Sequence, residues 1–396
     1  MRRLLGCATA LLALSTVSSA QLIVGHDDTS GGTNAWLVDV CTGTSEVLWD
    51  NTEAWGLAAD DANGKVYVAD GSTFAVWDYS QQGTNTPPTP IGTFTDTLGS
   101  TIAIIGLAFD GSKLYGYRST ANDEIYEIDT TTGVCTEVYA ASSTSASYGG
   151  LAYNPADGLI YVTNDGGSFL SGYGVYAIDL SDGSETFVVG YPNSETDIDG
   201  LAIGNNRLYL ITDDLGDEIY TYDLTLGKRL PGATLPITST EIFSAGAWAP
   251  GLAVPSVPTP YCSSQVNSNG CTPAIAYSGT PSATSGPFDI TADQMLNNSI
   301  GILFFGYDRN DLPYLGGTLC VSGSVRRTGA QNSGGTPPGT TDCTGTFSYP
   351  MGALIQSGSV PELIPGACVY AQYWSRDPGA ATTSNLSDAL SFRIEP

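Results

Sequence analysis

The segment IDGLAIGNNRLYLITDD, residues 198–214, repeats a pattern that the chain uses three times before it. The earlier copies are AWGLAADDANGKVYVADG (54–71), IIGLAFDGSKLYGYRS (104–119) and YGGLAYNPADGLIYVTND (148–165), and a shortened fifth copy, SAGAWAPG, occupies 244–251. One glycine marks each copy, with spacings of 50, 44, 50 and 46 residues: Gly56, Gly106, Gly150, Gly200 and Gly246. These spacings are close to the length of one four-stranded propeller blade.

Each full copy predicts a strand at the letters GLA, a tight turn and a second strand. The turns are built from Asn-Gly, Asp-Gly or Asn-Asn pairs, which tolerate the positive φ of two-residue hairpins. A third strand ends in an aspartate at one register in all five units: Asp39, Asp78, Asp129, Asp179 and Asp223. A glycine follows four or five residues later, so we interpret these carboxylates as caps of the turn to a fourth strand.

The two ends of the repeat region complement each other. The chain begins at Leu22 with a second, third and fourth strand but no GLA strand, and the region closes at Gly246 with a first strand alone. If the last strand completes the first unit, a closed ring follows, which hides the sheet edges. The predicted fold of residues 21–250 is therefore an all-β, five-bladed β-propeller with terminal strand closure.

A second domain is expected after a proline-rich stretch. Residues 251–260 contain prolines and no charge, which is typical of a semi-rigid linker. From 261 to 396 the apolar runs, among them GILFFGYD and ACVYAQYWS, alternate like half-buried strands. We therefore predict a small β-sandwich domain at 261–396.

The tail also contains several short motifs in a fixed order. They are YCSSQVNSNGCTPAI, GGTLCVSG, RRTGAQNSGG, AQYWSRDPG and LSDALSF, and they cover about the last third of the chain. In these motifs the tail resembles a C-terminal module found on many secreted proteins of planctomycete bacteria. The resemblance implies a module shared among secreted proteins with varied N-terminal domains, and it carries over no functional residue. The repeats resemble repeat propellers only generically.

The first twenty residues have the pattern of a secretion signal. Arg2 and Arg3 precede an apolar run, and Ser18-Ser19-Ala20 forms a small-residue cleavage site. The mature chain is then expected to begin at Gln21 and to be extracellular or at the cell surface. No later run is long enough to span a bilayer as a helix.

The chain has eight cysteines. In an oxidising compartment Cys262 and Cys271, and Cys320 and Cys343, bracket short loops and are disulfide candidates, although five cysteines in this domain leave the pairing open. Cys368 would then be left over as a buried small side chain. Cys41 and Cys135 fall in non-adjacent units, so pairing between them is not expected.

The net negative charge of the chain limits the classes of molecule that it can bind. The chain carries 40 acidic and 13 basic residues, and residues 21–260 alone hold 31 acidic against six basic side chains. Such a surface repels nucleic acid and anionic membranes and attracts cations. A simple alternative is that the acidic surface keeps a secreted protein in solution. Oligomeric state is not predictable from the sequence.

The usual catalytic arrangements are missing from the sequence. His26 is the only histidine, no nucleophile-elbow motif accompanies it, and neither a multi-histidine zinc site nor a phosphate loop can be formed. No catalytic residue is therefore predicted.

Carboxylates remain as candidate ligands. The fifth residue after the start of the second strand is acidic in three units, which makes Asp27, Asp165 and Asp213 the predicted metal site. Neighbouring positions add ligand-binding candidates: Asp28, Asp70, Asn164 and Asp214. The connection 195–199, ETDID, should reach the same face of the ring. Several oxygen ligands in one place suit Ca²⁺.

Three functions fit this pattern. The face could bind Ca²⁺ and, with it, a glycan or a protein partner, with Tyr115 and Tyr161 stacking on the ligand. Paired carboxylates could instead hydrolyse a glycoside or a lactone. The third alternative is a passive platform whose Asp and Asn residues only form turns. We predict a secreted binding or scaffold protein with the sandwich as an attachment module.

Overall fold

The computed structural model describes residues 21–26, 34–118, 123–192, 194–212, 219–230, 243–254 and 256–396. Within these ranges the chain consists of β-strands in mostly antiparallel sheets, with one α-helix, α1 (Met351–Gln356), and one short 3₁₀-helix, η1 (Tyr79–Gln81). The predicted all-β fold class is confirmed. The predicted secretion signal, residues 1–20, lies outside the described ranges.

Five sheets account for the N-terminal region, which we define as residues 21–254. They are numbered here in chain order. Sheet 1 contains β21 (Phe243–Trp248), β1 (Gln21–His26), β2 (Ala35–Asp39) and β3 (Ser45–Trp49). Sheet 2 contains β4 (Gly56–Asp60), β5 (Lys65–Asp70), β6 (Thr73–Asp78) and β7 (Thr89–Thr93). Sheet 3 contains β9 (Gly106–Phe109), β10 (Leu114–Arg118), β11 (Glu124–Ile128), β12 (Val134–Ala140) and β8 (Thr95–Asp96).

The remaining two sheets repeat the same order of strands. Sheet 4 contains β13 (Tyr148–Asn154), β14 (Leu159–Asn164), β15 (Gly174–Asp179) and β16 (Ser184–Gly190). Sheet 5 contains β17 (Gly200–Gly204), β18 (Arg207–Ile211), β19 (Ile219–Asp223) and β20 (Lys228–Leu230). Each repeated glycine of the sequence therefore lies in the first strand of a sheet.

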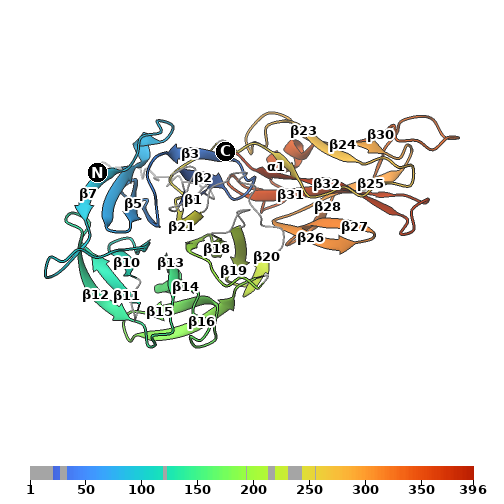
Figure 1. The fold of residues 1–396 in the computed structure, drawn as a ribbon. Helices are drawn as coiled ribbons and strands as arrows, with labels where there is room; N and C mark the ends of the chain where they lie inside the picture. Colours follow the sequence, from blue (N-terminus) through green and yellow to red (C-terminus); the bar gives the residue numbers. More distant parts are fainter. Residues whose placement is uncertain are drawn as a thin grey trace, which may run out of the picture.

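The sheets contact one another in cyclic order. The first strands β4, β9, β13, β17 and β21 each touch the next, and β21 touches β4 again. A separate hydrophobic core fills the space between each pair of neighbouring sheets, including the pair formed by sheets 5 and 1. Figure 1 shows the five sheets arranged around a common centre.

The last strand of the region completes the first sheet. β21 pairs antiparallel with β1, so that Leu22 lies opposite Trp248 and Val24 opposite Gly246. The prediction that a strand from the end of the repeat region joins the first unit is confirmed. Both ends of the region are thereby held in one sheet.

The repeated glycines permit close approach of the first strands. A Cβ on Gly150 would lie 2.6 Å from the backbone nitrogen of Leu201 in the neighbouring sheet. A Cβ on Gly56 would lie 3.0 Å from the Cα of Gly106. Any larger residue would push the central strands apart, which explains why glycine recurs at this register.

The aspartates that end the third strands cap turns, as predicted. Asp129 accepts hydrogen bonds from the backbone N–H groups of Thr131 and Thr132, at 2.8 and 2.9 Å. Asp39, Asp78, Asp179 and Asp223 each accept at least one backbone N–H two or three residues further on. These carboxylates hold the turn amides that no strand partner satisfies.

The C-terminal region, residues 256–396, forms two packed sheets and a hairpin. One sheet contains β22 (Thr259–Tyr261), β32 (Ser384–Arg393), β31 (Cys368–Arg376), β25 (Ile300–Gly306) and β28 (Arg326–Arg327), and β29 (Gln331–Asn332) also pairs with β25. The other contains β23 (Ala274–Gly279), β24 (Phe288–Met295) and β30 (Gly345–Tyr349); the hairpin is β26 (Asp308–Tyr314) and β27 (Gly317–Ser322). One hydrophobic core lies between the two sheets and α1.

The segment predicted as a linker is partly packed. Leu252 and Val254 are buried in the core between sheets 1 and 2. The C-terminal region's first strand, β22, begins at Thr259, two residues before the predicted domain boundary. Apolar side chains at 252 and 254 therefore extend the packed ring into the predicted linker.

The disulfides correct the expected pairing. Cys262 pairs with Cys320 and Cys271 with Cys343, instead of each cysteine closing the loop to its nearest neighbour in sequence. Cys368 is not left over, since it pairs with Cys41 of the N-terminal region. The three disulfides join cysteines that are 327, 58 and 72 residues apart in the sequence. Cys135 is a buried free thiol.

A buried ion pair joins the two regions beside the Cys41–Cys368 disulfide. The guanidinium of Arg393 donates to both carboxylate oxygens of Asp39, at 3.0 and 2.6 Å, and both side chains are buried. Arg309 donates to the backbone oxygen of Cys41 at 3.2 Å and stacks over Tyr261. These contacts fix the C-terminal region against sheet 1. Figure 1 shows the two regions lying side by side.

Candidate functional site

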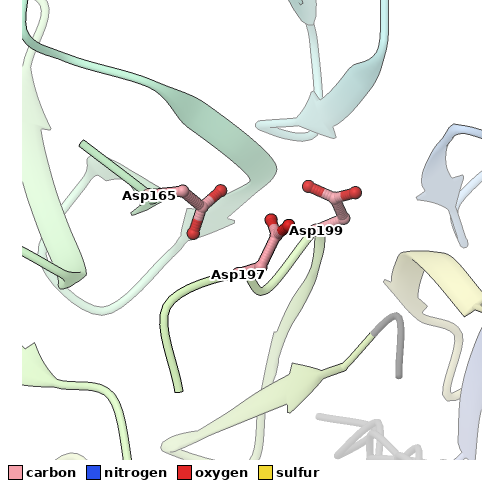
Figure 2. A group of neighbouring side chains, drawn as sticks. All are labelled: Asp165, Asp197 and Asp199. Atoms are coloured by element: carbon pink, nitrogen blue, oxygen red, sulfur yellow. The ribbon is translucent and has the colours of Figure 1, made fainter. Parts of the chain in front are cut away.

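Three carboxylates converge where sheet 4 meets sheet 5. Asp165 directly follows β14, and Asp197 and Asp199 lie in the connection that leads into β17. One carboxylate oxygen from each residue lies within 4.8 Å of the others. Figure 2 shows Asp165 facing Asp197 and Asp199 from the neighbouring segment. We call this group the acidic triad.

Local hydrogen bonds hold Asp165 in place. Its backbone N–H donates to the carbonyl of Ser147 at 2.7 Å. Its Oδ1 accepts from the hydroxyl of Tyr191 at 2.8 Å and from the backbone N–H of Ile198 at 3.2 Å. Because Ile198 lies between the two other acids, this last bond ties the loop after β14 to the connection before β17.

The environment of Asp165 favours its neutral form. Burial, together with the negative charges of Asp199 and Asp197, raises the pKa of Asp165 to about 8. The hydrogen bonds from Tyr191 and Ile198 lower the pKa but do not offset burial. Asp165 is therefore mostly protonated at neutral pH unless a cation replaces the proton.

Asp199 is the residue that departs from the repeat. It precedes the repeated glycine, at a position that the other four units fill with Trp55, Ile105, Gly149 and Ala245. Its carboxylate lies against Gly149 of the neighbouring strand, where a Cβ would come within 2.7 Å of Asp199 Oδ1. Glycine at 149 therefore makes room for the carboxylate of Asp199.

The chemistry of this donor set is that of a hard cation site, or of an acid–base group in which Asp165 can hold a proton. Three carboxylates supply between three and six oxygen ligands, which suits Ca²⁺. A protonated acid beside ionised ones is also the arrangement that general acid–base catalysis uses. Among the described residues this is the one group of His, Cys, Asp and Glu side chains arranged to hold a metal ion.

The group of carboxylates in the structure differs from the predicted metal site of Asp27, Asp165 and Asp213. Asp165 belongs to the acidic triad, but its partners are Asp197 and Asp199 from the connection 195–199. The other two predicted ligands, Asp27 and Asp213, lie outside the described residues, as do the ligand candidates Asp28 and Asp214. The side chain of His26, the last residue of β1, is also not described.

Asn164 has a structural role. Its Oδ1 accepts from the backbone N–H of Ser147 at 3.0 Å, and its Nδ2 donates to the carbonyls of Gly166 and Gly172. The side chain is fully buried. These bonds shape the loop that carries Asp165 and leave no amide hydrogen for a ligand.

The stacking role predicted for Tyr115 and Tyr161 is wrong. Both rings are buried in cores between sheets. Their hydroxyls donate to Asp110 at 3.2 Å and to Asp157 at 2.7 Å, in the turns that precede their own strands. Burial and the hydrogen bond to Asp157 raise the pKa of Tyr161 to about 12. Tyrosines near the start of a second strand therefore lie toward the first turn, away from the acidic triad.

Asp70 has a different neighbour. It ends β5, and its pKa is raised by burial and by Glu53, which shares a hydrogen bond with it. Glu53 lies three residues before its repeated glycine, as Asp197 does. This pair is a two-carboxyl counterpart of the acidic triad in sheet 2.

A cavity of about 290 Å³ lies at the opposite ends of the first strands. Its lining includes Asp60, Asp61 and Asp110, together with Trp248. The carboxylates are engaged within the protein, because Asp60 accepts from Asn63, Asp61 from Tyr79 and Gly251, and Asp110 from Ser112 and Lys113. This cavity is consequently a weaker candidate for a cation than the acidic triad.

Within the described residues, no helix is long and apolar enough to cross a membrane. The three disulfides are compatible with an oxidising, extracellular compartment.

Comparisons with known proteins identify no relative by sequence. No family model and no curated protein matches the chain. Among solved structures, the chain is similar to one described as a crystal structure of a nidogen/laminin complex, with 11% identity and a TM-score of 0.42, over 59% of this chain and 100% of that chain. It is also similar to a computationally designed protein, Ika8, with 16% identity and a TM-score of 0.28, over 69% of this chain and 71% of that chain. Similarities at this level assign neither a fold nor a function.

Proposed function

We propose that the N-terminal region is a five-bladed β-propeller. The cyclic contacts of the five first strands support this, as does the core between sheets 5 and 1. The pairing of β21 with β1 supplies the strand that such a closed ring requires. In this fold the loops after the second strands and the connections between blades share one face, which is where the acidic triad lies.

We propose further that the protein is a secreted binding protein whose acidic triad holds Ca²⁺. The observation that carries this proposal is the convergence of Asp165, Asp197 and Asp199 with oxygens within 4.8 Å. Two of the three are at least partly buried, and the neighbouring acids act on Asp165 as like charges that raise its pKa. A divalent cation would neutralise this repulsion and supply the charge that the site lacks.

The cation would also recruit the ligand. Ca²⁺ takes six to eight oxygen ligands, so three carboxylates leave coordination positions open for another molecule. Vicinal hydroxyls of a glycan, or a carboxylate of a protein partner, have the oxygen donors that such positions accept. The triad's own role is to hold the ion, with Asp197 exposed to solvent and Asp165 fixed by Tyr191.

The C-terminal region is proposed as an attachment or sorting module. Its resemblance to a module shared by secreted bacterial proteins supports this role. The buried Asp39–Arg393 ion pair would keep the propeller attached to the module. A secreted reporter fused to residues 256–396 should stay on producing cells, as we expect of the full chain. Release of the reporter into the medium would contradict the attachment role.

A thermal melt of the full chain in EDTA and in millimolar Ca²⁺ tests the cation site. A site that binds only the folded state stabilises by about 2.7 kcal/mol at a hundredfold excess over its dissociation constant. We expect a raised midpoint with Ca²⁺ that is lost in Asp165→Asn and in Asp199→Asn. Asp129→Asn, which alters a turn aspartate, is the matched control and should keep the response. An unchanged midpoint with Ca²⁺ would exclude the site.

The second candidate is a carboxylate-dependent hydrolase acting on a glycoside or a lactone. The raised pKa of Asp165 beside two other acids favours it, because a protonated acid next to an ionised one is what such catalysis needs. Turnover of a glycoside or lactone in EDTA, lost in Asp165→Asn, would establish this function. Absence of turnover by the folded protein across both substrate classes would reject it.

A further inference from the structure

A recessed apolar groove lies on the C-terminal region, on the face of its larger sheet that turns away from the main core. On β25 the side chains of Leu303 and Phe305 enter the core between the two sheets, so Ile302 and Phe304 point to the other face. The hairpin β26–β27 covers that face only in part. The uncovered part is a groove of about 450 Å³ whose floor includes Ile302, Phe304 and Trp374.

The walls of the groove expose large apolar side chains. Tyr314 and Leu315, at the tip of the hairpin, are 45% and 38% exposed, and Val325, just before β28, is 44% exposed. Clustered apolar side chains of this size are uncommon on a surface that has no ligand. The volume lies in the range of sites for small molecules, about 300–1,000 Å³.

Leu315 occupies a backbone position that does not favour leucine. Its φ is 49°, in the left-handed region, and Gly316 follows with φ 82°. Asparagine normally precedes glycine in such a turn. The carbonyl of Leu315 is held by Thr382 Oγ1 at 2.6 Å and by Gln265 Nε2 at 3.3 Å, so the turn is fixed without help from the leucine side chain. The leucine side chain therefore contributes to the groove lining and is not needed to hold the turn.

One charged residue lines the groove. Arg327, opposite Phe304 on β28, is exposed, and within the described part of the chain it forms no hydrogen bond or ion pair through its side chain. Its neighbour Arg326 is instead paired with both carboxylate oxygens of Glu362, at 2.7 and 2.9 Å. Because Arg327 lines the groove and forms no ion pair among the described residues, its guanidinium can pair with an anion bound in the groove.

We propose that this groove binds one free medium-chain fatty acid. The acyl chain would lie over Ile302, Phe304 and Trp374, and its carboxylate would pair with Arg327. A glycan fits less well, because six of the nine lining residues have no hydrogen-bonding group in their side chains, and hydroxyl groups placed against them would lose their hydrogen bonds to water. A bilayer surface does not fit, because the groove is recessed and the chain strongly acidic. The proposal does not depend on the acidic triad.

Calorimetric titration of the full chain with decanoate and dodecanoate, in EDTA so that the triad plays no part, tests the proposal. We expect one site per chain, with dodecanoate binding about 15-fold tighter than decanoate because each buried methylene contributes about fourfold. Arg327→Gln should weaken decanoate about tenfold and leave decanol unchanged. Arg376→Gln, an exposed arginine at the end of β31 outside the groove, is the matched control and should change neither ligand.

Leu315→Asn keeps the favoured turn conformation and removes the apolar side chain, so it should weaken decanoate and decanol equally without loss of stability. The proposal is overturned if decanoate does not bind with saturation, or if Leu315→Asn and Arg327→Gln leave its binding unchanged. It is also overturned if the chain sediments with phosphatidylcholine vesicles and shows no one-to-one binding of free decanoate.

Discussion

The N-terminal region uses aspartate in two ways. Asp129 is an exposed turn residue whose carboxylate accepts two backbone N–H groups, and these bonds lower its pKa. Asp165 follows a second strand, is partly buried, faces two other acids, and has its pKa raised to about 8. Because the residue type is the same, the difference comes from the surroundings. A repeated aspartate is therefore a turn cap at one register and, beside Asp197 and Asp199, a candidate ligand at another.

Asp39 extends this comparison, because it has the turn register of Asp129 but is buried. It accepts the N–H of Cys41 as Asp129 accepts Thr131, and it also receives Arg393 from the C-terminal region. In sheet 1 the capping aspartate therefore also joins the two regions.

The largest expected effect is on this anchor. Asp39→Ala leaves Arg393 buried without its partner, which should lower the free energy of unfolding by about 3–5 kcal/mol. Denaturant unfolding of the full chain measures the loss. Asp129→Ala, the matched exposed position, should give a clearly smaller loss. Equal losses of unfolding free energy in Asp39→Ala and Asp129→Ala would show that the ion pair with Arg393 adds no stability beyond that of the capped turn.

The second prediction concerns pH and Asp165. A pKa raised in the folded state means that the folded chain holds a proton that the unfolded chain releases, so stability should fall as pH rises from about 4 to about 8. In EDTA, Asp165→Asn should remove this slope and be about 2 kcal/mol more stable than the wild type at pH 9, after allowance for solvent screening. Thermal melts from pH 5 to 9 measure it, and a parallel slope in both proteins would contradict the shift.

Asp129 should behave in the opposite sense. The N–H groups of Thr131 and Thr132 lower its pKa in the folded chain. Ionised Asp129 therefore stabilises the folded chain at pH values above the pKa of the unfolded chain, and this stabilisation is lost as the pH falls through the pKa of the folded chain. Asp129→Asn should therefore change the acid limb of the stability profile below about pH 4 and leave the range from 5 to 9 unaltered.

A third prediction addresses the space that Gly149 provides. Gly149→Ala places a methyl group against Asp199 Oδ1 and should displace that carboxylate, weakening Ca²⁺ about tenfold, or about 1.4 kcal/mol. Titration calorimetry measures the affinity. Gly92→Ala, on the open edge strand β7 where nothing lies within 4 Å, is the control. Unchanged affinity in Gly149→Ala would mean that Asp199 is not a ligand.

Much of the fold could be predicted from the sequence because strand pairing follows local patterns. The repeated glycines, the positive-φ turns and the missing first strand of unit one were enough to predict that β21 joins β1. The pairing of Cys41 with Cys368 could not be predicted in this way, because it depends on how two regions meet in space. Proximity in sequence favoured the wrong partners for Cys262 and Cys320, because both disulfides inside the C-terminal region join segments that are distant in the sequence.

The site was predicted in part. Counting positions identified Asp165, and the sequence 195–199 was assigned to the same face. The prediction then assumed that equivalent residues of different blades gather together, whereas the structure groups one loop with the adjacent connection. The available signal was Asp199, the one acid at a position otherwise filled by Trp55, Ile105, Gly149 and Ala245. The positions of Tyr115 and Tyr161 depend on strand direction, because both lie near the start of their strands, at the opposite end of the sheet from the residue after β14, Asp165.

Proton release on Ca²⁺ binding tests the central claim most directly, because cation and proton compete for Asp165. Calorimetric titration of the full chain at pH 7, in two buffers with different ionisation enthalpies, counts the protons released. Because the pKa of Asp165 is raised to about 8, binding at the acidic triad should release most of one proton per Ca²⁺ at pH 7 and far less at pH 9, and Asp165→Asn should abolish the release. Ca²⁺ binding without proton release at pH 7, or release that persists in Asp165→Asn, would contradict the assignment of the cation to these three aspartates.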